Sequence, residues 1–87
     1  MHIVLRGRVQ GVGFRWFVRE AARRAQLSGW VRNRQDGAVE IEAEGPTATL
    51  ESFRMLVARG PDGAVVTSVD DVEISAEALE QPFTIIR

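Results

Sequence analysis

The residues best suited to chemistry lie between positions 10 and 15, where Gln10-Gly11-Val12-Gly13 interrupts a strand-like pattern and Phe14-Arg15 begins a helical one. Gly11 and Gly13 let the backbone turn sharply and approach a ligand closely. The first N–H groups of a helix have no internal partner and lie at the positive end of its dipole, so they suit a phosphate. Arg15 adds a planar guanidinium that can hold two phosphate oxygens. The segment therefore predicts an anion site, although a turn that only connects a strand to a helix can have the same spacing.

The charge distribution agrees with an anionic partner. An arginine near a helix N-terminus is electrostatically unfavourable unless a negative group compensates it. Residues 1–34 contain eight arginines and one acid, whereas residues 35–87 contain three arginines and eleven acids, so the net charge of −1 hides an asymmetry. The basic half suits a small phosphate compound or a nucleic acid, but arginines that pair with acids elsewhere would give the same composition.

The elements that position the glycine-rich segment can be predicted from periodicity. Alternating residues predict a strand over 2–9, and the apolar spacing from Phe14 predicts a helix that ends near Leu27. A second strand is expected over 30–34. Asp36-Gly37 then predicts a hairpin turn, because this dipeptide accepts the positive φ angles that such turns require.

The strand after this turn covers 39–44 and alternates strictly between apolar and acidic residues. Its apolar members are expected to face the core. Its acidic members are expected to form the solvent face, not a catalytic set; they are Glu40, Glu42 and Glu44. His2 has no acidic or cysteine neighbours at metal-binding spacing in the sequence, and it is likewise expected to be solvated.

The remaining pattern predicts one more helix and two more strands. The helix opens at Gly45-Pro46-Thr47 and closes at Gly60-Pro61, and its inner face is expected to consist of Leu50, Phe53, Leu56 and Val57. A strand over 65–74 follows. Val69 is out of step with the later apolar residues of that strand, which indicates a bulge near Asp70-Asp71. The last strand is expected over 83–86.

This order of elements predicts the fold class. Helices that separate strands in this way lie on one face of a mainly antiparallel sheet. We therefore expect an α+β, ferredoxin-like βαββαβ sandwich with a short extra C-terminal strand, forming a single domain over residues 1–87. Because this scaffold carries enzymes, RNA-binding domains and ligand-sensing modules, the fold alone does not name a function.

Composition excludes several other classes of protein. The 87 residues contain no cysteine, so a disulfide framework, a thiolate metal site and a cysteine nucleophile are excluded. No apolar run approaches the roughly 20 residues that a membrane span needs, and the first nine residues do not resemble a signal peptide. We expect a cytoplasmic monomer that does not bind membranes.

Two segments resemble one known family. Gly7-Arg8-Val9-Gln10-Gly11-Val12-Gly13-Phe14-Arg15 resembles the acylphosphatase signature G-x-V-x-G-V-x-F-R at every fixed position. Residues 29–40 are similar to the second motif of that family, G-W-V-x-N-x-x-D-G-x-V-E, and Gly60-Pro61 and Phe83-x-Ile85-x-Arg87 also fit its pattern. Two long motifs in the right order are far more specific than a single glycine-rich turn.

The resemblance implies an enzyme, an acylphosphatase that hydrolyses the carboxyl–phosphate anhydride of acyl phosphates to a carboxylate and inorganic phosphate. It implies no metal and no other cofactor, with inorganic phosphate as a product, and we expect inorganic phosphate to act as an inhibitor as well. The catalytic arginine of the family corresponds to Arg15, and its catalytic asparagine corresponds to Asn33. The backbone loop that binds phosphate corresponds to Gln10, Gly11, Val12, Gly13 and Phe14.

Several neighbours of these residues receive weaker expectations. Trp16 lies off the apolar stripe of its helix, where family members often have tyrosine, and it either packs against a loop or borders the site. Arg32 and Arg34 alternate with Asn33, so they are expected on the other side of their strand as surface charges. Trp30 is expected to anchor the sheet to a helix.

Two other functions use the same fold. The first motif also resembles the N-terminal domain of the hydrogenase-maturation carbamoyltransferase, so a regulatory, non-enzymatic module that binds phosphate or carbamoyl phosphate is the main alternative. An RNA-binding domain of this shape stacks bases on aromatic residues of its sheet. The corresponding positions here hold no phenylalanine or tyrosine, so we expect no nucleic-acid partner. The motif residues are expected to bind phosphate and orient water, so the motifs do not indicate which acyl group the physiological substrate carries.

Overall fold

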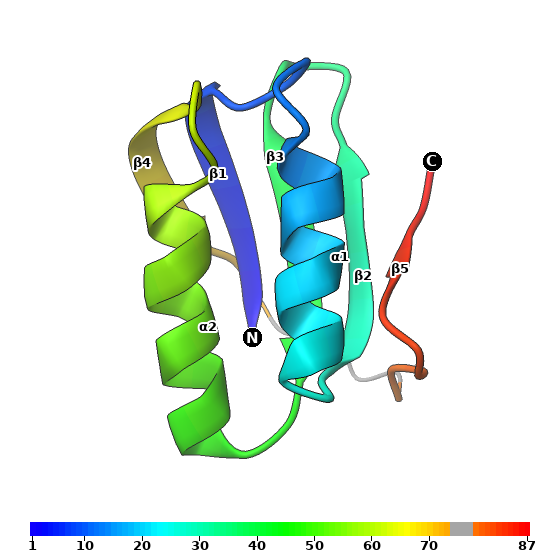
Figure 1. The fold of residues 1–87 in the computed structure, drawn as a ribbon. Coiled ribbons are helices and arrows are strands. Elements are labelled where there is room, and N and C mark those ends of the chain that lie inside the picture. The colour runs from blue at the N-terminus through cyan, green and yellow to red at the C-terminus, as the bar shows by residue number, and fades with distance from the viewer. Residues whose placement is uncertain (74–77) are drawn as a thin grey trace.

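The computed structural model describes residues 1–73 and 78–87. Its helices and strands follow one another along the chain as Figure 1 shows: β1 (His2–Arg8), α1 (Phe14–Arg24), β2 (Ser28–Asn33), β3 (Val39–Glu44), α2 (Thr47–Arg59), β4 (Val65–Asp71) and β5 (Thr84–Ile85). The expected end of the fourth strand, at residue 74, lies outside the described residues.

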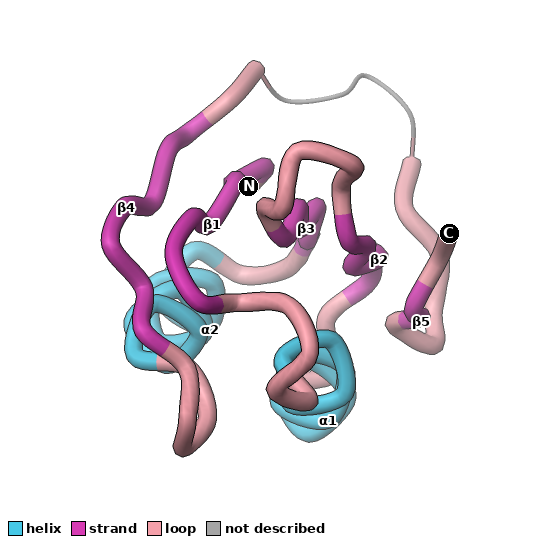
Figure 2. Tube along the Cα trace, turned by 90° about the horizontal axis from the view of Figure 1, so that it is seen from above, coloured by secondary structure: helices cyan, strands magenta, loops and turns pink. Residues whose placement is uncertain are grey.

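The strands form one sheet in the order β4-β1-β3-β2-β5. β1 pairs antiparallel with both β3 and β4, and β2 pairs antiparallel with β3. β5 adds to the edge of β2 in parallel orientation. Both helices lie on the same face of this sheet, as the view from above in Figure 2 shows. The predicted ferredoxin-like sandwich with a short additional strand is confirmed.

The hydrophobic core fills the space between the helices and the sheet. Its fully buried members come from almost every element, and they include Ile3, Leu5, Val9, Phe14, Val18, Ala22, Val31, Ile41, Phe53, Val57 and Phe83. Val39, Ile41 and Ala43 face this core as the alternation predicts. Leu56 was expected on the inner face of α2 but is 43% exposed, because Phe53 and Val57 already fill the contact with the sheet.

The first helix ends earlier than the apolar stripe predicts. α1 ends at Arg24, and Gln26 has a left-handed backbone with φ of 57°. The N–H of Leu27 donates to the carbonyl of Ala22 at 3.0 Å, which folds the chain back and buries Leu27 against the core. Leu27 therefore continues the apolar stripe from a turn instead of from the helix, and β2 can begin at Ser28, two residues before its predicted start.

The bulge in β4 lies closer to the start of the strand than expected. Arg6 pairs with Ser68 and Gly7 pairs with Val66, so Thr67 is the additional residue. Val66 and Val69 both pack against the core. Two residues three positions apart can face the same side of a strand only if one extra residue lies between them. The bulge predicted at Asp70-Asp71 is therefore wrong, because the pairing is regular there, and Val72, which is out of step with Val69, is 37% exposed.

The sheet face away from the helices differs from the prediction. Glu44 is exposed as expected, but Glu40 and Glu42 are only 7% and 4% exposed. The Nε2 atom of His2 lies 2.6 Å from Oε2 of Glu40, and the rings of His2 and Trp30 meet edge to face at a centroid distance of 5.6 Å. His2 is thus not solvated, and Trp30 packs on this face instead of against a helix.

Glu40 is the charged centre of that face. The Nε–H of Arg32 donates to Glu40 at 2.7 Å, on the side opposite His2. Burial acts to raise the pKa of Glu40, but the hydrogen bonds from Arg32 and His2 outweigh it, so the pKa is lowered. The carboxylate therefore stays ionised and links β1, β2 and β3 through their side chains.

We expect Glu40→Gln to lower the melting temperature at pH 7 and to have little effect in acid. The folded-state pKa of Glu40 is depressed, so its stabilisation is fully present above the unfolded-state pKa of about 4.3 and is lost as the pH falls through the folded-state value. Thermal unfolding from pH 7 to pH 2.5 measures this. Glu44→Gln on the same strand is the control, and an undiminished effect of Glu40→Gln at the lowest pH would contradict the assignment.

Candidate active site

The site begins where the chain leaves β1 and enters α1. Gly13, which precedes the helix, has φ of 73° and ψ of 20°, a left-handed conformation that glycine adopts without strain. The first helical hydrogen bond runs from the Phe17 N–H to the Gly13 carbonyl at 3.0 Å. No side chain caps the helix, and its first turn contains no acid. Backbone N–H groups at the positive end of α1 therefore point out of the helix without a partner among residues 1–73 and 78–87.

Gln10 holds this segment against the hairpin between β2 and β3. Its Nε2 group donates to the carbonyl of Arg34 at 2.8 Å and to the carbonyl of Ala38 at 2.9 Å. Those two residues close the hairpin, because the Arg34 N–H donates to the Ala38 carbonyl at 2.8 Å. The side chain of Gln10 is thus a tether between the loop before α1 and the end of the strand that carries Asn33.

This tether brings distant residues around one cavity of about 300 Å³, which we call the loop cavity. It is lined by Val9, Gly11, Gly13, Arg15, Trp16, Asn33 and Ile85. The loop before α1, the start of α1 and the end of β2 all lie at the same end of the molecule (Figure 1). Arg15 and Asn33, which are eighteen positions apart in the sequence, therefore meet at one site.

Asn33, which lines this cavity, carries an unusual polar atom. It is the last residue of β2 and pairs in register with Val39. Its Oδ1 atom is buried and accepts no hydrogen bond from any described residue. A buried acceptor without a partner is costly, typically 1–3 kcal/mol, so such atoms mark places where a ligand or water belongs.

Arg15 differs from most other arginines of the basic half because those arginines form ion pairs with carboxylates. Arg6 and Arg34 lie within 4 Å of Asp36, Arg32 pairs with Glu40, and Arg19 pairs with Glu20. Within the described part of the chain, no carboxylate is paired with Arg15. The charge asymmetry of the sequence is thus partly explained by pairing across the surface, and Arg15 is left with its charge beside the helix N-terminus.

A second cavity shares Asn33 with the first. It measures about 570 Å³ and is lined by Arg32, Asn33, Arg34, Gln35, Asp36 and Arg87. The Ala38 N–H bonded to Asp36 is the main cause that lowers the pKa of this carboxyl, and Arg6 and Arg34 add to the effect. Asp36 therefore carries a negative charge within this otherwise basic cavity.

The structure places the expected site residues in two different ways. Gly11, Gly13, Arg15 and Asn33 line the loop cavity, whereas Phe14 is buried in the core and Gln10 turns its side chain to the hairpin. Gln10, Val12 and Phe14 were expected to act through their backbone, so their side chains can serve other purposes. Sequence reasoning missed Val9 and Ile85 as cavity walls and the tether by Gln10. Trp16 borders the cavity, one of its two expected places.

Metal-binding groups and membrane-spanning helices bear on the class of site. Among residues 1–73 and 78–87, no group of three or more histidine, cysteine, aspartate or glutamate side chains is arranged to hold a metal ion. In the same residues no helix has both the length and the apolar character needed to cross a membrane. A glycine-rich loop, a free helix N-terminus and a guanidinium around one cavity are typical of phosphate-binding proteins.

Comparison with known proteins identifies the family. The acylphosphatase family model matches residues 1–85. The acylphosphatase of Salinibacter ruber is 56% identical over 75 residues, which cover 85% of this chain and 79% of the relative. The crystal structure of acylphosphatase from Bacillus subtilis matches with a TM-score of 0.85 and 42% identity, covering 99% of this chain and 96% of that chain. The chain belongs to the acylphosphatase family.

A further match concerns the alternative that the sequence left open. Full-length HypF, solved in a phosphate- and nucleotide-bound form, matches with a TM-score of 0.88 and 31% identity, covering 99% of this chain but only 11% of HypF. The acylphosphatases, in contrast, are matched over most of their own length. The family, the fold and the acylphosphatase function predicted from the two motifs are confirmed, and the regulatory module is not favoured.

The tether predicts how Gln10 contributes to stability. We expect Gln10→Ala to lower the free energy of unfolding by about 1–2 kcal/mol, because two hydrogen bonds are lost. Gln10→Glu should cost more at pH 7, since its carboxylate would face two carbonyl oxygens, and should recover partly when the carboxylate is protonated in acid. Urea unfolding of the three proteins measures both effects. An unchanged urea midpoint for Gln10→Ala would show that the tether does not contribute to the free energy of unfolding.

Proposed function

We propose that this chain hydrolyses acyl phosphates at the loop cavity, with Arg15 and the loop 10–15 holding the phosphoryl group and Asn33 orienting the attacking water. The observation that carries the proposal is the meeting of Arg15, Gly11, Gly13 and Asn33 around one cavity. These residues come from three segments, and they supply a cation, close backbone approach and a polar side chain to one volume.

The phosphoryl group is bound by charge and by backbone donors. The guanidinium of Arg15 offers two parallel N–H groups to two phosphoryl oxygens, while the free N–H groups at the start of α1 bind the oxygens on the other side. These donors are already oriented before the substrate arrives. They therefore stabilise the charge that shifts onto the phosphoryl oxygens in the transition state without a cost of reorganisation.

Asn33 positions the nucleophile. Its unpartnered Oδ1 accepts a hydrogen bond from a water molecule, whose oxygen attacks the phosphorus while the bond from phosphorus to the bridging oxygen breaks. The leaving group is a carboxylate, which is stable without protonation, so no general acid is required. An amide is not a base, and the proton of the water passes to a phosphoryl oxygen of the substrate. Orientation and electrostatics account for the rate.

The same proposal includes several finer expectations. The domain works as a monomer in the cytoplasm without a metal or other cofactor, and inorganic phosphate inhibits by occupying the Arg15 site. Phosphate inhibition is expected because product and substrate present the same phosphoryl oxygens to Arg15 and the loop 10–15, which we call the phosphate cradle. Assays are therefore run in a chelator, with phosphate as the competing ligand.

Arg15 variants test the proposal directly. Wild type should release phosphate from acetyl, benzoyl and carbamoyl phosphate in the presence of chelator, and Arg15→Ala should abolish both turnover and inhibition by phosphate. Each charge-assisted hydrogen bond contributes about 1.5–3 kcal/mol, and the guanidinium makes two. Arg15→Lys should also fail, because an ammonium is a point charge without the planar fork. A lysine variant with near-native affinity for phosphate would refute the cradle.

Asn33→Ala separates positioning of water from binding of phosphate. If Asn33 orients water, kcat should fall by about 10²–10³, as for loss of an oxyanion-hole donor, while the inhibition constant of phosphate stays nearly unchanged. A structural amide would instead weaken phosphate binding and lower the melting temperature together. The rate constant, the inhibition constant and the melting temperature of one variant distinguish these roles, and intact turnover would exclude the role in catalysis.

A further inference from the structure

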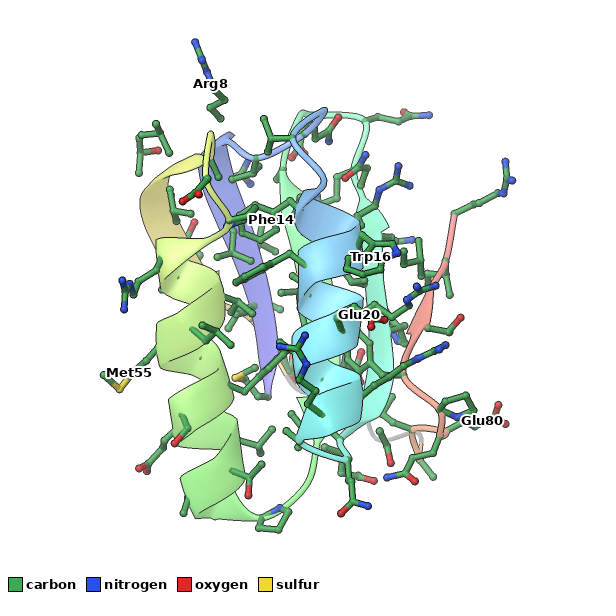
Figure 3. All side chains as sticks on the ribbon, viewed as in Figure 1. Arg8, Phe14, Trp16, Glu20, Met55 and Glu80 are labelled. Carbon is green, nitrogen blue, oxygen red and sulfur yellow. The ribbon has the colours of Figure 1, made fainter. Side chains whose placement is uncertain are left out.

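Trp16 occupies an unusual place beside the loop cavity. It follows Arg15 directly, lines the cavity, and is 56% exposed, whereas its neighbour Phe14 is buried in the core. Figure 3 shows Trp16 on the side of α1 that faces β2 and β5. Ile85 of β5 lines the same cavity, so an aromatic ring and a branched aliphatic side chain both border the space that Arg15 and Asn33 share.

The ring of Trp16 is held in place from its own helix. The guanidinium of Arg19, one turn further along α1, lies over this ring at 5.5 Å from its centroid, and Arg19 itself pairs with Glu20 at 3.2 Å. A cation over an aromatic face restrains the orientation of the ring. The exposed indole is therefore a prepared apolar surface, and such a surface gains free energy when an apolar group covers it.

The proposed reaction determines what can cover this surface. Once the phosphoryl group lies between Arg15 and the loop, the acyl group must extend along one of the remaining walls of the cavity. Resting on the proposed function, we infer that Trp16 and Ile85 form a subsite for the acyl group, which favours acyl phosphates with an aromatic or bulky apolar acyl group. The residues that select such substrates then lie outside the two motifs whose residues bind phosphate and orient water.

The adjoining basic cavity offers the other direction for the acyl group. Arg34 and Arg87 line it and would attract a second anionic group on the substrate. However, Arg34 is already paired with Asp36 at 3.2 Å, and Arg32 with Glu40. The ionised carboxylate of Asp36 lies in the same cavity and would repel an anionic acyl group. These carboxylates weaken the attraction of the basic cavity for an anionic acyl group, although Arg87 has no carboxylate partner among the described residues, and an apolar acyl group finds its contacts at Trp16 and Ile85 instead.

The test compares substrates that differ only in the acyl group. For wild type, Trp16→Ala, Trp16→Phe and Met55→Ala, kcat/KM is measured with benzoyl, acetyl and succinyl phosphate. The ratio of benzoyl to acetyl phosphate should fall about tenfold in Trp16→Ala, the size expected for loss of an aromatic contact, and should be largely retained in Trp16→Phe. Met55 is also exposed and apolar but lies on α2, away from the cavity, so Met55→Ala should leave the ratio unchanged.

Inhibitors give an answer that does not depend on turnover. Phenacylphosphonate and acetonylphosphonate carry a methylene group in place of the bridging oxygen of benzoyl and acetyl phosphate. Wild type should bind phenacylphosphonate more tightly, and Trp16→Ala should lose this preference while its inhibition constant for inorganic phosphate stays near that of wild type. These binding constants are measured by calorimetry for the same four proteins.

The outcomes separate the subsite from the proposed function. If wild type hydrolyses acetyl phosphate but Trp16→Ala changes neither the substrate ratio nor the phosphonate preference, the subsite is wrong and the function stands. If wild type hydrolyses none of the substrates, the function fails, and the phosphonate preference alone decides whether the apolar wall exists. A preference for succinyl phosphate that Arg34→Ala removes would assign the acyl group to the basic cavity and overturn the inference.

Discussion

The two hydrogen bonds from Gln10 to the carbonyls of Arg34 and Ala38 connect parts of the site that lie far apart in the sequence. The strands β1 and β2 are not neighbours, because β3 lies between them in the sheet. The loop after β1 must therefore pass the start of β3 to reach Asn33. An amide with two donors can bridge that gap to both sides of the hairpin, which gives Arg15 and Asn33 a common frame.

The charges around the loop cavity make a second contribution to the site, beside the Gln10 tether. The start of α1 has no capping side chain and no acid in its first turn, and Arg15 adds a positive charge at the same place. The two arginines next to Asn33 are paired with carboxylates, Arg32 with Glu40 and Arg34 with Asp36. Arg15, which has no carboxylate partner among the described residues, thus keeps its positive charge beside the uncapped start of α1, and this suits a small, doubly charged phosphoryl group.

Much of this arrangement could be predicted from the sequence, because it depends on local patterns. Alternation placed Val39 and Ile41 toward the core, the glycine-rich segment indicated a free helix start, and two motifs indicated Arg15 and Asn33. Alternation shows which side of a strand a residue occupies but not how much that side is covered. Glu40 was therefore expected in solvent, whereas the side chains of His2 and Arg32 surround it. The end of α1 and the tether by Gln10 depend on contacts with distant segments, which no local pattern contains.

The position of Ile85 has a consequence for the order in which the protein loses structure. Ile85 closes one side of the loop cavity, yet it belongs to a strand of two residues that pairs only with β2 at the edge of the sheet. Short edge elements open at a lower free energy than the core strands, so this wall can detach while the central strands stay folded. Such a partial opening would leave the proposed phosphate site around Arg15 intact and remove the wall that we propose for the acyl group, so that selectivity among substrates would be lost at a lower temperature than affinity for phosphate.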